Sequence, residues 1–174
     1  ESVVRDLPTA DFLGQHQLVA HYLGNPMMDE TVPRGLDLGL EGQLTLALFP
    51  GSRAQAPEEL PRQLRIWARV WQDFPCRAAV AVAEGLDLSL LVQHCRGWKL
   101  HLSQQEQGRV GWLSHPQLPE VLLIRRALGD LLARSQLALG QAGTAHEQAA
   151  GAGLPVVSLH PRPAGPLGWY RGRQ

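Results

Sequence analysis

The sequence predicts an α/β domain whose sheet is doubly wound and mostly parallel. Between Leu44 and Leu159, short apolar runs of strand length alternate with segments of helical periodicity. Several of these runs are apolar at nearly every position, as expected for strands that helices cover on both faces. Such alternation implies right-handed crossovers between parallel strands, with helices on both sides of the sheet.

The first buried strand is expected at 44–49, where the run LTLALF contains a single polar residue. The turn at 50–53, Pro-Gly-Ser-Arg, ends this strand. A helix should follow, because apolar residues then recur three and four positions apart, and the two prolines near its start are tolerated there. The apolar stripe of this helix consists of Leu60, Leu64, Trp67, Ala68 and Trp71.

Short apolar or alternating runs mark the later strands, and a loop containing proline separates two of them. These strands are expected at 77–83, 98–102, 110–113, 121–124, 137–140 and 156–159. Further helices are expected at 86–94, 127–134 and 144–152. Residues 1–24 contain one strand signal, at 18–23, and residues 24–43 have the Gly, Pro and Asp content of a linker or long loop.

Composition narrows the possible functions. The 174 residues suffice for about one domain, and 16 basic residues balance 16 acidic ones, which gives no reason to expect a nucleic-acid partner. No apolar run is long enough to span a membrane as a helix. Cys76 and Cys95 lack CxxC spacing, and the seven His show no paired metal-ligand spacing, so neither a disulfide scaffold nor a metal is expected.

Ligands of open parallel sheets bind outside the carboxyl ends of the strands, so the loops that follow strands are the candidate sites. These loops are 50–53, 84–85, 103–109, 140–144 and 160–168. In the first loop, Gly51 allows close approach of the backbone to a ligand, Ser52 offers a hydroxyl, and Arg53 offers a fork for phosphate oxygens. The alternative is an ordinary turn with a solvated Arg.

The loop at 140–144 leads directly into a helix. Small residues at such a junction leave free N–H groups that favour a phosphate, and a tight turn capped by Thr144 is the alternative. His146 is expected to face solvent in preference to a phosphate. Residues 61–174 carry thirteen basic and seven acidic residues, which favours either an anionic ligand or basic, solvated helix faces.

Three segments, in this order and approximate spacing, resemble a known family. They are LGNPMMDE at 23–30, LALFPGSR at 46–53 and GQAGTAHEQAAGAGLPVV at 140–157. They are similar to the linker, the phosphate loop and the donor-site segment of lipid-A-disaccharide synthase, a two-domain nucleotide-sugar glycosyltransferase of the GT-B class. The resemblance implies the C-terminal, Rossmann-like half of such an enzyme.

The family transfers a hexosamine-type sugar from a UDP-sugar to a glycolipid acceptor in bacterial lipid A biosynthesis, without a cofactor or a metal. By this resemblance the candidate donor-binding residues are Gly51, Ser52, Arg53, Gly143, Thr144, Ala145, Glu147 and Gln148. The catalytic residues are unknown and are expected in an N-terminal domain that also binds the acceptor.

The resemblance also implies which residue of the last helix faces the ribose of the nucleotide. The family places an acidic ribose ligand seven residues before the proline of the final strand, which is Gln148 here. We therefore expect Gln148 to face the ribose, Glu147 to face elsewhere, and a carboxylate introduced at position 148 to bind UDP more tightly. A register slip of one residue, which would make Glu147 the ligand, is the alternative.

The implied domains are a remnant of the acceptor domain at 1–24, an interdomain linker at 25–43 and an incomplete donor domain at 44–174. Alone, this fragment is expected to be inactive. The implied location is the cytoplasm, peripheral to the inner membrane, and membrane contact and a homodimer are left open. A nucleotide-sugar epimerase of the same architecture and a non-catalytic nucleotide-binding or protein-interaction module remain alternative functions.

Overall fold

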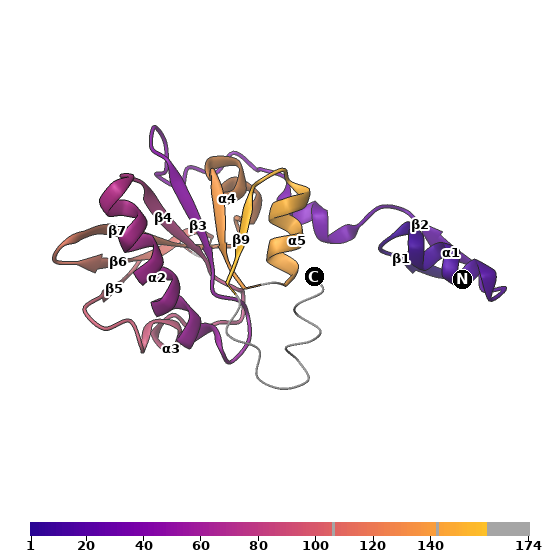
Figure 1. Cartoon of the computed structure of the whole chain (residues 1–174), viewed down its shortest axis with the longest axis horizontal. Coiled ribbons are helices and arrows are strands. Elements are labelled where there is room, and N and C mark those ends of the chain that lie inside the picture. Colours follow the sequence, from indigo (N-terminus) through magenta and orange to yellow (C-terminus); the bar gives the residue numbers. More distant parts are fainter. Residues whose placement is uncertain (106, 142, 160–174) are drawn as a thin grey trace.

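A computed structural model describes residues 1–105, 107–141 and 143–159. Most of these residues form one sheet with helices packed on it (Figure 1). The strands of this sheet are β3 (Thr45–Phe49), β4 (Arg77–Ala81), β5 (Lys99–Leu102), β6 (Gly108–His115), β7 (Leu118–Arg125), β8 (Leu137–Gly140) and β9 (Val156–Ser158). The helices are α2 (Ala56–Asp73), α3 (Leu88–Val92), α4 (Leu128–Arg134) and α5 (Thr144–Gly151).

The seven strands lie in the order β5-β6-β7-β4-β3-β8-β9. Strands β7, β4, β3, β8 and β9 run parallel, and Leu46 in the central strand β3 is paired with Ala78 on one side and Leu137 on the other. The predicted mostly parallel sheet is therefore confirmed. Along the chain, the parallel strands extend first from β3 to β4 and β7, and then on the other side to β8 and β9. This order is compatible with a Rossmann-like fold, and it reverses between β3 and β8.

The predicted alternation of strand and helix is wrong in one region. Strands β5, β6 and β7 follow one another without an intervening helix, and both of their pairings are antiparallel. The physical reason is the length of the connections, because a parallel crossover needs a dozen or more residues and usually a helix. The predicted proline-containing loop is a tight hairpin between His115 and Leu118, and Pro119 lies inside β7.

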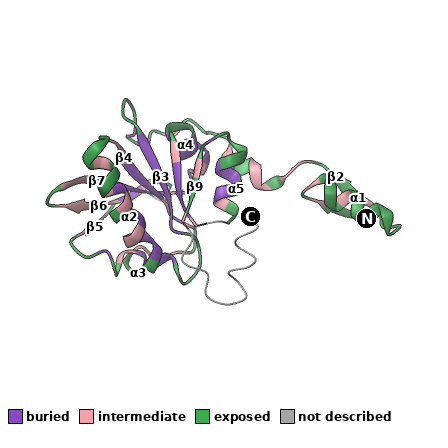
Figure 2. Cartoon of the chain, viewed as in Figure 1, coloured by how far each residue is buried: buried purple, intermediate pink, exposed green. Residues whose placement is uncertain are grey.

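The core lies on both faces of the sheet, as the buried ribbon segments of Figure 2 show. On one face, α2 buries Leu60, Leu64 and Trp67 against β3 and β4. The predicted core position of Trp67 is confirmed, since its side chain is 0% exposed and its Nε1 donates to the Cys76 carbonyl at 3.3 Å. On the other face, residues of α4 and α5, among them Leu131 and Ala149, pack on the sheet.

Cys76 and Cys95 are both free thiols on the α2 side of the sheet. Cys95 is buried, and this burial raises the pKa of its thiol to about 12. Cys76 is half-buried, and desolvation also raises its pKa, although the hydrogen bond with Trp67 acts in the opposite direction. A raised pKa leaves little thiolate at neutral pH, so both side chains are poor nucleophiles.

The segment predicted as a linker packs on the sheet and its helices. It begins with a 3₁₀ helix, η1 (Pro26–Thr31), which contacts α4 and α5. The buried carboxylate of Asp130 in α4 accepts hydrogen bonds from the backbone N–H groups of Arg34 (2.9 Å) and Leu36 (3.0 Å). Leu38 and Leu40 are then buried in the core. Residues 25–43 therefore belong to the same packed body as the sheet.

A second, small unit precedes this body and stands beside it in Figure 1. It consists of β1 (Ser2–Val4), α1 (Leu7–Gln15) and β2 (Ala20–Tyr22), with the two strands parallel. Only β2 was expected from the sequence. The signal for α1 was available: the Asp6 carboxylate accepts from the Thr9 N–H at 2.8 Å, and a proline lies in the first turn. None of the residues 1–37 is buried.

Within the described part of the chain, no helix combines the length and apolarity needed to cross a membrane. The predicted loop at 160–168 lies outside the described residues.

Candidate functional site

A cavity of about 900 Å³ lies at the carboxyl ends of the parallel strands β3, β4, β7 and β8. It includes the place between β3 and β8 where the strand order reverses, the position at which open α/β sheets usually bind ligands. Its walls include residues of both loops that the sequence indicated, namely 50–53 throughout and residues 141, 143 and 144 of the loop at 140–144. Two segments that are far apart in the sequence therefore meet in one cavity.

The first wall is the turn after β3. Gly51 has a φ of +96°, a left-handed conformation that side chains with a Cβ rarely adopt. The carbonyl of Phe49, at the end of β3, accepts a hydrogen bond of 2.9 Å from the buried Gln63 side chain of α2. This bond fixes the strand end from which Ser52 and Arg53 extend along the cavity.

The second wall is the start of α5. Gly143, Thr144 and Ala145 line the cavity, and the first N–H groups of a helix have no partner within that helix. These donors and the positive end of the helix dipole favour an anion. The two walls approach closely because Gly140 in β8 lies against Phe49 in β3, where a Cβ would overlap the Phe49 carbonyl oxygen.

His146 lies on the inner side of α5, and the expectation that it faces solvent is wrong. The residue is buried, and its ring meets the Phe49 ring edge-on, with 6.0 Å between the ring centroids. Its Nδ1 lies 3.2 Å from the Ser158 hydroxyl in β9. Residue 146 directly follows the cavity-lining residues Thr144 and Ala145, but its side chain points into the sheet. His146 therefore anchors α5 to β3 and β9.

Gln148 and Glu147 point in different directions. Gln148 is 4% exposed and lines the cavity. Its Nε2 lies 2.7 Å from the Met27 carbonyl oxygen and 3.3 Å from Glu30 Oε2, both in η1. The Glu147 side chain is half exposed, does not line the cavity, and lies 3.9 Å from an Arg5 guanidinium nitrogen. The candidate site therefore contains Gln148 and leaves Glu147 outside.

The cavity also contains charged residues that were not among the candidate donor-binding residues. They are Asp29, Glu30, Arg34, Glu84 and Arg126. Arg126 forms an ion pair with Glu84, and the Arg34 guanidinium donates to the Arg126 carbonyl. Among the described residues, Arg53 forms no ion pair, so its charge remains available to a ligand.

These charged residues come from separate parts of the chain, and among them Asp29 and Glu30 lie in one of the three segments that resemble the family. The loop at 84–85 contributes Glu84, as its position after a strand predicted, whereas the described residues of the loop at 103–109 do not line the cavity. Arg34 and Arg126 have no local sequence signal, because only tertiary packing brings the linker beside the end of β7.

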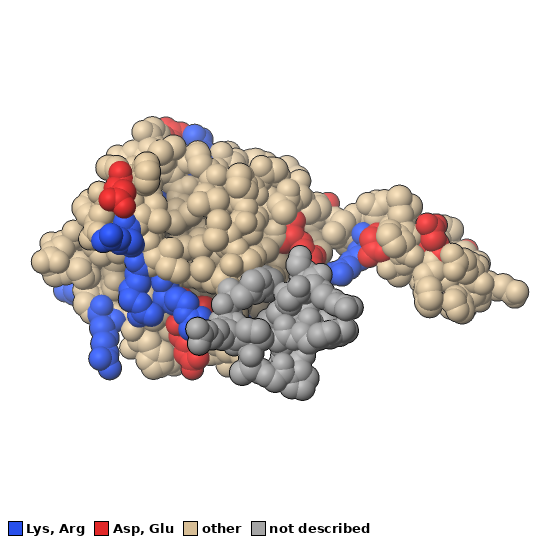
Figure 3. Space-filling model, viewed as in Figure 1, with Lys and Arg blue, Asp and Glu red and all other residues tan. Residues whose placement is uncertain are grey.

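Other basic side chains lie away from the cavity. Lys and Arg side chains gather over the face that carries α2 and α3 (Figure 3). Arg65 and Arg69 of α2 are exposed and do not line the cavity. For these residues the structure matches the alternative of a basic, solvated helix face.

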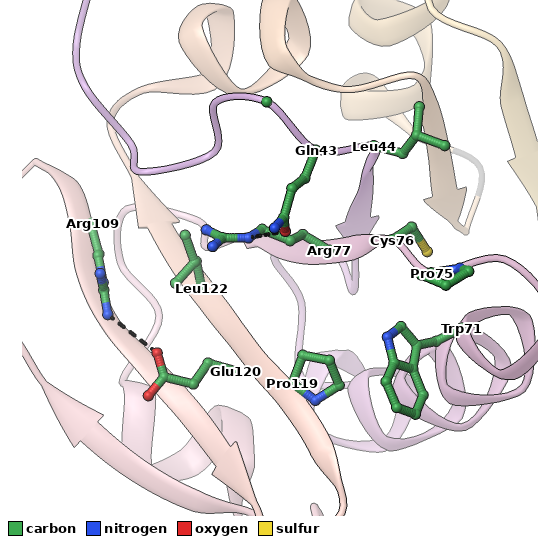
Figure 4. A pocket seen from close by; sticks show the side chains of 11 residues that line it. Gln43, Leu44, Trp71, Pro75, Cys76, Arg77, Arg109, Pro119, Glu120 and Leu122 are labelled. Atoms are coloured by element: carbon green, nitrogen blue, oxygen red, sulfur yellow. Dashed lines mark hydrogen bonds and ion pairs between the residues drawn. The ribbon is translucent and has the colours of Figure 1, made fainter.

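A second cavity, of about 680 Å³, lies near the amino ends of β3, β4 and β7 (Figure 4). Its two guanidinium groups already have protein partners. Arg77 Nε donates to Gln43 Oε1 at 2.6 Å, and Arg109 lies 3.7 Å from Glu120. Since ligands of open sheets bind at the opposite edge, this cavity is the weaker candidate.

The described residues contain no group of three or more His, Cys, Asp or Glu side chains arranged to hold a metal ion. The chain was also compared with known proteins. No protein-family model matches the sequence, and no match was found among the curated proteins.

Proposed function

We propose that this chain is the donor-binding half of a two-domain nucleotide-sugar glycosyltransferase similar to lipid-A-disaccharide synthase. In this proposal the sheet is the doubly wound, Rossmann-like half of a GT-B enzyme, and the cavity binds a UDP-sugar. One observation carries the proposal: the loops at 50–53 and 140–144, which lie in two of the segments that resemble that family, line one cavity at the strand-order reversal.

The chemistry of the walls suits a nucleoside diphosphate. Its negative charge would lie between the N-terminus of α5 and the Arg53 guanidinium, with the Ser52 and Thr144 hydroxyls beside it. These groups would stabilise the charge that develops on the departing diphosphate when the sugar is transferred. The base that activates the acceptor and the surface that holds the glycolipid would belong to the other domain, at the cytoplasmic side of the inner membrane.

Calorimetric titration with UDP, ADP and GDP tests the proposal. We expect UDP to bind most tightly, because the resemblance is to an enzyme that uses UDP-sugars. Replacement of Arg53 by Ala should weaken UDP binding about fivefold, which corresponds to about 1 kcal/mol for a partly exposed, charge-assisted hydrogen bond.

Arg65→Ala is the matched control, because it removes the same charge from the exposed face of α2, away from the cavity. Equal affinity for all three nucleotides would favour a general nucleotide-binding module. Absence of binding by any of them would contradict the proposal.

A further inference from the structure

We infer that Glu30, a residue of η1, supplies the carboxylate that binds the ribose hydroxyls of the nucleotide. The inference rests on the proposed function and adds to it the residue that distinguishes a ribose from a deoxyribose. It starts from the arrangement of Gln148 and Glu30, which come from different segments of the chain and line the same cavity.

The donor capacity of Gln148 is already used. A primary amide has two N–H groups, and Nε2 of Gln148 has two acceptors, the Met27 carbonyl and Glu30 Oε2. The amide therefore holds η1 against α5 and orients the Glu30 side chain. Only the amide oxygen remains, and this oxygen cannot replace a carboxylate that accepts from two hydroxyls.

Glu30 has the chemistry that Gln148 lacks. It is exposed at the cavity, and among the described residues it forms no ion pair, so its charge is not neutralised by an Arg. A carboxylate has about four acceptor positions. The Gln148 amide occupies one of them at Oε2, and Oε1 can accept from a vicinal diol.

The position of Glu30 also fits the place expected for the ribose. Thr144 and Gln148 are four residues apart, which is about 6 Å along a helix. With the diphosphate at the start of α5, the adjoining ribose would lie about one helical turn along the same wall, beside Glu30. Glu147 cannot take this role, because it does not line the cavity and its carboxylate lies toward Arg5.

The test compares UDP with 2′-deoxy-UDP by calorimetry, on the full chain and on two variants with the same charge change. We expect the unaltered chain to prefer UDP, and Glu30→Gln to weaken UDP binding about tenfold and abolish that preference. The direction of the change in UDP affinity distinguishes the causes. If Glu30 acted only through its charge, removal of this negative charge beside an anion site would tighten UDP binding. Glu147→Gln should keep both the affinity and the preference.

Each other outcome has a defined meaning. If UDP binds but Glu30→Gln keeps the same affinity, or if the unaltered chain shows no preference for UDP, the inference is overturned and the proposed function stands. If the unaltered chain does not bind UDP, the proposed function fails and the inference fails with it. Thermal unfolding should show that Glu30→Gln folds, since the Glu30 side chain is exposed and, within the described part of the chain, accepts one hydrogen bond.

Discussion

The Gln148 side chain joins two segments that are far apart in the sequence, because its amide in α5 donates to Met27 and Glu30 in η1. Counting back from the final strand placed the residue on the cavity wall, where it lies. Its partners were not predictable, because Met27 and Glu30 reach it only through tertiary packing of η1 on α5. The same limit applies to His146, whose burial depends on a contact with Phe49 in a distant strand.

These contacts reverse the expectation for Gln148→Glu. The substitution would remove the donor to the Met27 carbonyl and place a second carboxylate beside Glu30, where the two groups are now 3.3 Å apart. We expect a loss of about 1–3 kcal/mol in the free energy of unfolding, since a half-buried carbonyl loses its partner and the buried position 148 gains a charge. UDP binding should weaken, because repulsion displaces Glu30. Urea denaturation and calorimetry measure the two effects.

A double variant separates the causes. Gln148→Glu combined with Glu30→Gln removes the repulsion between the carboxylates. The double variant still lacks the hydrogen bond from residue 148 to the Met27 carbonyl. We expect the double variant to be less destabilised than the sum of the single variants. Additive effects would show that the two side chains are not in contact.

Helices and strands were predicted from the sequence most accurately where most of their residues are buried. The strands at 45–49 and 77–81 are buried almost throughout and were predicted from continuous apolar runs. The helix at 7–15 was missed although Asp6 and the proline in its first turn mark its start. It is short, and none of its residues is buried in the structure. The strands at the β5-β6-β7 edge were located correctly, but the direction of β6, which is antiparallel to both of its neighbours, was not. The reason is that the apolar pattern of a strand is the same in both directions.

The packing of the linker on α4 leads to a prediction about Gly129. This glycine lies in the first turn of α4, where a Cβ would overlap the Val32 carbonyl and lie 2.7 Å from Thr31 O. Gly→Ala within a helix usually stabilises by about 0.5–1 kcal/mol. Here we expect Gly129→Ala to destabilise by about 1–3 kcal/mol, because backbone atoms of the linker must move. Thermal or urea denaturation measures the change.

Gly151→Ala in α5 is the matched control. Its Cβ would meet the end of the Met28 side chain, which can adopt another rotamer at little cost. We expect this variant to be as stable as the unaltered protein, or slightly more stable. If both variants behave alike, the close contact between α4 and the linker does not determine stability.

For the whole molecule, the structure places the edge of the packed body near residue 25, ahead of the strand at 45–49. The segment at 25–43 contributes Leu38 and Leu40 to the core and two backbone N–H groups to Asp130. Its Gly, Pro and Asp content favoured a linker, because a segment without regular periodicity gives no sign of where it packs. The exception is the partial alternation of leucines at positions 36, 38, 40 and 44, which was a signal that this segment has a buried side.

The last prediction concerns deletion of residues 1–24. None of these residues is buried, and the ion pair between Arg5 and Glu147 is a 3.9 Å contact between exposed side chains, which is worth about 0–1 kcal/mol. The deletion should therefore change the melting temperature of the remaining body little, and UDP affinity should stay the same. Deletion of residues 1–43 should instead prevent stable folding, because it removes two core leucines and leaves the buried Asp130 carboxylate without its donors. Differential scanning calorimetry of the two truncated proteins distinguishes these outcomes, and an equal loss of stability in both would show that residues 1–24 support the sheet.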